Sequence, residues 1–224
     1  MSKLSGQLCL WLLLVASPML HAQQRDFGAW GYIQLKYKIN QKWSVGYTEH
    51  HLRNENASER WMNIHDAFGQ CRINRFLSHE FHLRNIQYQH MDNKIENRWL
   101  IFYALVGSYK IQKWQLSMRS RWQQLTYEDH WNDAYKGPYY YHRLKTAADY
   151  IINYHWRLGG STEWFMPLNR PNRSRLDQVR WTTDLTYRKN QHLAFDFFYQ
   201  IQQPIGRIHP RYYFILGTGI HLTL

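Results

Sequence analysis

The chain has 224 residues and a formal net charge of +12, and 17% of its residues are aromatic while 20% are charged. The mean hydropathy is -0.65, and the longest apolar run beyond the N-terminus covers only residues 100–106, whereas a membrane-spanning helix needs about 20 apolar residues. The composition therefore excludes a helical membrane protein, and one domain is expected for this length.

Residues 1–22 have the features of a secretory signal peptide. Lys3 supplies positive charge, residues 8–16 form an apolar segment, and Ala22 is the small residue before the expected cleavage site. We therefore predict a signal peptide over residues 1–22 and a mature domain over residues 23–224. Cleavage would remove Cys9 and leave Cys71 without a partner for an intramolecular disulfide.

Residues 178–202 alternate between apolar and polar side chains in the manner of a β-hairpin. One parity carries aromatic and aliphatic residues on both sides of a turn at residues 189–191, and the other carries charge and amide. The apolar stripe is about ten residues long, which is roughly what a tilted strand needs to cross a bilayer. We expect Leu185 and Phe195 to face lipid.

The same period recurs along the rest of the mature chain. We predict eleven strands, at residues 27–37, 42–54, 60–73, 78–90, 96–111, from 114 to a loop at 127–138, 139–152, 156–166, 178–188, 193–202 and 211–224. In the second strand Glu49, His51 and Arg53 continue the apolar parity as polar groups, which predicts a bulge or a rise out of the lipid.

The connections alternate between short and long, as they do in outer-membrane barrels with short periplasmic turns. Such barrels have an even number of strands in bacteria, and a sheet edge in lipid would leave backbone groups unpaired. Either residues 23–29 add a short strand, or the N-terminus begins on the outer side. The prediction is an all-β fold, a single closed antiparallel transmembrane β-barrel of about 10–12 strands.

A set of short motifs is spread over most of the mature chain. They are Asp26 and Trp30, Lys42 and Trp43 after the first turn, the spacing from Glu49 to Arg53, Glu163 before a polar loop, and Arg180 leading the strand of Tyr187. Together they resemble a family of Gram-negative outer-membrane β-barrel proteins catalogued as a domain of unknown function. The resemblance implies a barrel in the cell outer membrane and nothing about activity.

The C-terminal residues 219–224 resemble the signal by which the outer-membrane assembly machinery recognises a last strand. The segment has a glycine followed by two spaced hydrophobic residues, with Leu224 in the place where an aromatic residue is usual. This resemblance implies the assembly machinery as a partner after secretion across the inner membrane.

Arg143, Glu163, Arg180 and Asp184 share the polar parity of neighbouring strands, so we expect a polar cluster in the lumen. Opposite charges there would pair, because an unpaired buried charge is costly. The cluster is either a plug of ion pairs or a selective pore lining. Arg119 and Arg121 lie on the same parity, and such bulky groups predict little or no steady conductance.

The sequence predicts no metal site, cofactor or catalytic residue. His50 and His51 are adjacent and point to opposite faces of a strand, and Ser78, His79 and Glu80 alternate in direction in the same way. The short turn after the third strand puts Ser78, His79 and Glu80 on the predicted periplasmic side, away from outer-leaflet lipid. We therefore expect a protein that is not an enzyme.

Five arginines fall in two long loops on the predicted outer side, namely Arg170, Arg173, Arg175, Arg207 and Arg211. Lipopolysaccharide phosphates lie at that level, and arginine suits phosphate. The alternative is solvated loop charge. Because basic residues are spread among aromatic strands, nucleic acid is not expected as a partner.

The sequence thus favours a monomeric outer-membrane barrel surrounded by lipid and lipopolysaccharide, with a structural role or a narrow channel. Two alternatives remain open. One is a barrel enzyme that modifies lipid or lipopolysaccharide. The other is a soluble periplasmic barrel that binds lipid, with the same alternation turned inside out.

Overall fold

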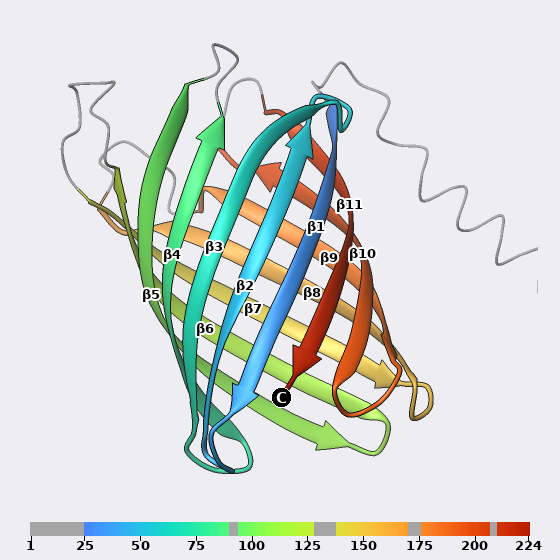
Figure 1. The fold of residues 1–224 in the computed structure, drawn as a ribbon. Coiled ribbons are helices and arrows are strands. Elements are labelled where there is room, and N and C mark those ends of the chain that lie inside the picture. The colour runs from blue at the N-terminus through green and yellow to red at the C-terminus, as the bar shows by residue number, and fades with distance from the viewer. Residues whose placement is uncertain (1–24, 90–93, 128–137, 170–175, 207–209) are drawn as a thin grey trace, which may run out of the picture.

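Backbone hydrogen bonds join all the strands into one closed barrel in the computed structural model (Figure 1). The structure describes residues 25–89, 94–127, 138–169, 176–206 and 210–224. The strands are β1 Arg25–Lys38, β2 Trp43–Asn54, β3 Glu59–Arg72, β4 Leu77–Gln89, β5 Ile95–Ile111, β6 Trp114–Tyr127, β7 Tyr139–Ile151, β8 Trp156–Pro167, β9 Gln178–Arg188, β10 Leu193–Pro204 and β11 Tyr212–Thr223. Each strand expected from the alternation is confirmed, with ends that differ by at most two residues. The described residues contain no helix that could cross a membrane.

The eleven strands close through a parallel pair. Neighbours along the chain are antiparallel, but β1 pairs with β11 in the same direction, from Arg25 opposite Tyr212 to Lys36 opposite Thr223. The even strand number was therefore the wrong expectation. Residues 25–29 are the continuous beginning of β1 and add no separate strand. The barrel instead begins at the end that carries the longer connections, which is the second alternative.

Five short turns and the C-terminus gather at the other end of the barrel, at the bottom of Figure 1. Four of these turns have one asparagine at the same place, whose side-chain oxygen accepts two backbone N–H groups at 2.8–2.9 Å; these are Asn40, Asn74, Asn153 and Asn190. Asparagine favours such turns because its side chain replaces a backbone acceptor. The repeated turn fixes the register of each hairpin.

The two faces of the sheet differ as the alternation predicts. Large apolar side chains are exposed on the outside, including Trp181 (41%) and Phe197 (51%), and Leu185 and Phe195 share their parity. The buried polar side chains of the lumen include Arg121, Gln123, Arg143, Glu163, Gln200 and Gln202. An apolar exterior around a polar interior is the arrangement of a transmembrane barrel.

One part of the lumen is apolar, which the alternation does not predict. Leu52, Met62, Ile64, Ile86, Leu100 and Phe102 are buried together, with Trp30, Tyr88 and Leu125 packed against them. They come from β1 to β6, on the half of the barrel toward the longer connections. We call this set the apolar plug. It fills that side of the lumen near the longer connections, while the polar lumen residues of the same strands, such as Asp66 and Glu80, lie nearer the short turns.

Side chains from three strands hold the parallel seam closed. Tyr32 on β1 donates to Asp196 on β10 at 2.5 Å, and His221 on β11 lies 2.6 Å from the same carboxylate. The ring of Tyr32 covers Gly219, where an added Cβ would lie 2.1 Å from the ring, so no larger residue fits there without moving it. At the C-terminal end, Lys38 N donates to Leu224 O at 3.0 Å.

The bulge expected in the polar part of β2 is confirmed. The register with β3 shifts between Leu52 and Arg53, which is the bulge. Glu49 and His51 lie outward near the longer connections, with Glu49 Oε1 at 3.2 Å from His51 Nε2 and both side chains largely exposed. The rise of this part of β2 out of the lipid stays a prediction.

Leu185→Arg should destabilise the barrel by about 2–4 kcal/mol, or block assembly, because it places a charge on the lipid face in mid-strand. Ser161→Arg is the matched control, since Ser161 lines the lumen cavity beside polar groups. Urea unfolding of the barrel reconstituted in lipid measures both. Equal destabilisation by the two substitutions would contradict the assignment of faces.

Candidate functional site

A cavity of about 460 Å³ occupies the middle of the lumen. Its walls carry seven cationic side chains and five carboxylates. The cations are Arg84, Arg119, Arg121, Arg143, Lys145, Arg157 and Arg180, and the carboxylates are Glu80, Asp149, Glu163, Asp184 and Asp196. Such a concentration of ionisable groups in a water-accessible interior makes this cavity the candidate site.

Glu163 on β8 is the centre of the ion pairs on one wall. Arg119 donates to its Oε1 at 2.8 Å and Arg143 donates to its Oε2 at 2.7 Å, while the Nη1 of Arg180 lies 3.7 Å from Oε2. Glu163 is buried. One carboxylate therefore neutralises charge from three strands, and it joins β6, β7 and β9 through β8.

Strand register places these cations side by side. Arg121 on β6 lies opposite Arg143 on β7, and Arg119 lies opposite Lys145. Like charges directly opposite one another destabilise a sheet. We call Arg119, Arg121, Arg143, Lys145 and Arg180 the cationic cluster. Because Glu163 is opposite both Lys145 and Arg180, it is the acidic residue placed to offset their repulsion.

Several guanidinium groups of the cationic cluster stack on aromatic rings. The guanidinium carbon of Arg143 lies 4.0 Å from the ring centre of Phe165, and that of Arg180 lies 5.0 Å from it. Arg121 lies 3.9 Å from the ring centre of Phe102 in the apolar plug. Such contacts stabilise a partly desolvated guanidinium. They also fix where each planar group points.

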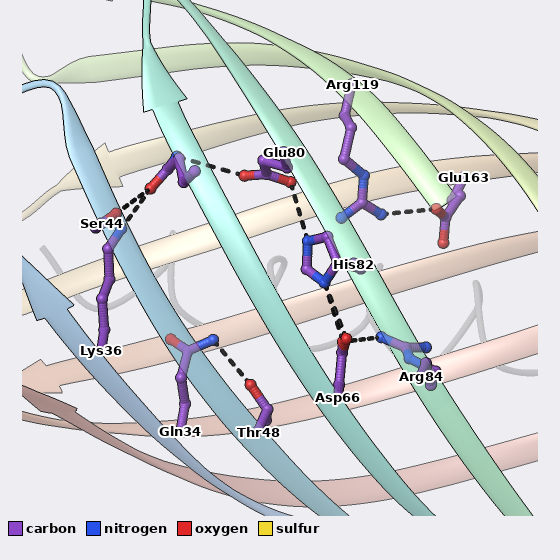
Figure 2. A network of polar contacts seen from close by, with 11 residues as sticks. Gln34, Lys36, Ser44, Thr48, Asp66, Glu80, His82, Arg84, Arg119 and Glu163 are labelled. Carbon is purple, nitrogen blue, oxygen red and sulfur yellow. Dashed lines mark hydrogen bonds and ion pairs between the residues drawn. The ribbon is translucent and has the colours of Figure 1, made fainter. Parts of the chain in front are cut away.

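A second polar network crosses the opposite wall, as Figure 2 shows. His82 Nδ1 lies 3.0 Å from Asp66, and Arg84 donates to the same carboxylate at 2.5 Å. His82 Nε2 lies 3.8 Å from Glu80, whose other oxygen accepts from Gln70 at 3.4 Å. The acidic groups of this wall therefore have partners of their own.

Two carboxylates lie together toward the short turns. Asp149 and Asp184 flank Gly159, and a Cβ added to this glycine would lie 2.6 Å from oxygens of both. Gly159 on β8 is the register partner of Asp149 on β7 and of Asp184 on β9. Arg157 Nη1 lies 3.9 Å from Asp149. The cavity thus has a cationic part and an acidic part.

The structure brings together three of the four residues expected in the lumen cluster. Arg143 and Arg180 surround Glu163, whereas Asp184 lies lower, beside Asp149. Parity alone could not separate them, because it gives the face and not the height. Arg119 was expected to face the lumen, but its pairing with Glu163 across β7 was missed.

The loop arginines are described only in part. Arg170, Arg173, Arg175 and Arg207 lie outside the described residues. Arg211 pairs with Glu55 at 2.7 Å and lies 3.5 Å from Asp26, which ties its loop to the beginning of β1. Contact of these arginines with lipopolysaccharide stays a prediction.

The residues considered for catalysis or metal binding lie apart. His79 points outward and is hydrogen-bonded to Tyr103, whereas Glu80 lines the lumen cavity. His50 accepts a hydrogen bond from Trp30 Nε1 at 3.2 Å. Within the described residues, no group of three or more His, Cys, Asp or Glu side chains is arranged to hold a metal ion.

A serine–histidine pair that the sequence analysis missed lies on the outer face. Ser120 Oγ is 2.7 Å from His142 Nε2, between β6 and β7. Trp122 packs against the histidine ring at 5.2 Å between centroids. No carboxylate of the described residues is ion-paired with His142, so the pair lacks the group that orients the base in a hydrolase.

Glu163→Gln should destabilise the barrel by about 3–5 kcal/mol, because it leaves buried arginines without their shared carboxylate. Glu49→Gln is the control, since this largely exposed carboxylate pairs with His51 and with no other cation among the described residues, and its loss should cost about 0–1 kcal/mol. Urea unfolding gives both values. A Glu163→Gln barrel as stable as the control would show that the cationic cluster does not need this carboxylate.

Comparisons with known proteins agree with the barrel. A solved structure of the NanC porin in a rhombohedral crystal form is similar over 79% of this chain and 86% of that chain, with a TM-score of 0.51 and 9% sequence identity. At that identity the likeness shows the fold alone. None of the curated proteins matches the chain. The family described as "Protein of unknown function (DUF2490)" matches residues 27–207, and the chain belongs to this family.

Proposed function

We propose that the protein is a narrow channel in the outer membrane of a Gram-negative cell, through which small hydrophilic solutes pass. The observation that carries this proposal is the cavity of about 460 Å³ in the middle of a lumen lined by charged side chains. A barrel with a structural role alone has no need of a solvated interior. Buried charge is costly, and a folded barrel could fill the same space with apolar side chains.

A path from the cavity toward the short turns supports the proposal. A second cavity of about 410 Å³ lies against the turns at residues 152–155 and 189–192, and it shares Arg157 and Asp196 with the first. Toward the longer connections, the apolar plug fills the β1 to β6 side. The polar route therefore runs along β7 to β11.

Side chains of β1, β9 and β10 that line the first cavity approach one another beside this route. The guanidinium carbon of Arg180 is 6.0 Å from the ring of Trp30, which also packs edge-on against Phe198 at 5.7 Å. These side chains reach toward one another across the lumen. They explain why the channel we propose is restricted to small solutes.

The outward apolar face favours the membrane over a soluble lipid carrier. A carrier would line its cavity with aromatic side chains, whereas here the cavity is lined mainly by charged ones and the aromatic stripes are exposed. A lipid-modifying enzyme would have to use the Ser120–His142 pair. That pair sits in the middle of β6, at the depth of the acyl chains, away from the interfacial level of lipid ester groups.

Single-channel recording in planar bilayers tests the proposal. Wild-type protein should give a small conductance, far below that of an open porin, because bulky side chains narrow the lumen. The double variant Trp30→Ala with Arg180→Ala should raise it several-fold. Glu163 keeps its contacts with Arg119 and Arg143 in this variant, so the barrel should still fold.

The control is Ile33→Ala with Trp181→Ala, which removes two large exposed side chains from the outer faces of the same two strands, β1 and β9. It should leave the conductance unchanged. A large open conductance of the wild type would contradict the narrow lumen. Absence of conductance in both the wild type and the Trp30/Arg180 double variant would contradict a channel and leave a structural barrel.

A further inference from the structure

We propose that the lumen cavity binds a small oxyanion, a solute that carries a carboxylate or phosphate group, at Arg121 in the cationic cluster. This inference rests on the proposed channel, because it names the class of solute that the same lumen would take. Its basis is one buried arginine without a counterion and the charge of the wall around it.

Arg121 has no acidic partner. The residue is 5% exposed and lines the cavity, and its Nε is buried without a hydrogen-bond partner. No ion pair or hydrogen bond joins Arg121 to any residue in the described part of the chain. Its immediate strand neighbours are Ala104 and Arg143, and Glu80, beyond Ala104 on β4, makes no ion pair with it. A buried charge in this state is costly unless a ligand neutralises it.

The nearby carboxylates are already engaged. Glu163 accepts from Arg119 and Arg143. Glu80 lies on β4, level with Arg121 across Ala104, but its polar contacts are with Gln70 and His82. The cationic cluster thus has five positive groups, and Glu163 is the carboxylate that forms ion pairs with three of them. An excess of cationic groups at a water-accessible cavity attracts anions from solution.

The shape of the donors specifies an oxyanion. A guanidinium presents a planar fork that matches the two oxygens of a carboxylate or the oxygens of a phosphate. Phe102 lies under the face of the Arg121 guanidinium and holds its plane. Gln200, which is 4% exposed and also lines the cavity, has a buried Nε2 without a partner. Hydroxyl groups of Ser161 and Thr182 complete a lining that can hydrogen-bond a ligand.

The acidic part of the cavity limits where the anion binds. Asp149 and Asp184 lie toward the short turns and repel an anion there. Arg143, which lies opposite Arg121, is six residues away from Asp149 along β7, toward the apolar plug. The ligand should therefore be held at the cationic end of the cavity.

Isothermal titration of the purified full-length barrel in a nonionic detergent tests the site. The probes are inorganic phosphate and citrate, with chloride at the same ionic strength as the reference. Phosphate or citrate should bind. Binding should also raise the temperature at which the folded barrel unfolds, seen on a gel as the change from the mobility of the folded protein to that of the unfolded protein. Arg121→Met should weaken this binding about ten- to a hundredfold, because it removes the charge-assisted hydrogen bonds.

Arg75→Met is the matched control, since Arg75 is exposed in the turn between β3 and β4 and its loss changes the net charge equally. It should bind as the wild type does. If Arg121→Met does not fold, Arg121→Lys replaces it. That variant keeps the charge and should still bind more weakly, because lysine lacks the paired donors.

Two results would overturn the site: no binding of either anion to the wild type, or equal binding by the wild type and the Arg121 variant. The proposed channel function is contradicted by a different result from the one that contradicts the anion site. Anion binding without conductance would leave this site standing and contradict the channel, whereas conductance without anion binding would do the reverse.

Discussion

The need to pair every backbone N–H and C=O group governs this protein, because lipid offers no hydrogen bonds to a free sheet edge. Eleven strands meet that need only if the first and last run in the same direction, because the ten antiparallel steps between them, an even number, leave the last strand parallel to the first. The β1–β11 seam is that pair. Tyr32, Asp196 and His221 reinforce it from inside, and Gly219 gives the tyrosine ring room.

Closure of the barrel also determines which side chains are buried in the lumen. A closed barrel with an apolar exterior must enclose its polar parity, so charges that would be solvated on a soluble sheet are buried here. The protein satisfies some of them by pairing, as at Glu163 and Asp66. It leaves Arg121 without a carboxylate. Structure and proposed function therefore come from one imbalance, in which the fold buries more cationic than acidic groups on one wall.

Much of the fold follows from the sequence because a strand has a period of two, and the exposed Trp181 and Phe197 lie on the parity that predicts lipid contact. The apolar plug does not follow, because Leu52 and Ile64 lie in segments where both parities are partly apolar. The parallel seam does not follow either, since alternation says nothing about which strands become neighbours across the ends of the chain. For the site, parity places Asp184 with Glu163 in the lumen, but only the register shows that Asp184 lies beside Asp149.

Cell fractionation with heat-dependent gel mobility tests the central claim of a closed barrel in the outer membrane most directly. The account predicts that the full-length protein pellets with the outer membrane and migrates differently before and after boiling, because a closed barrel resists detergent until it is heated. Recovery of the protein in the soluble periplasm, with the same mobility before and after boiling, would contradict it.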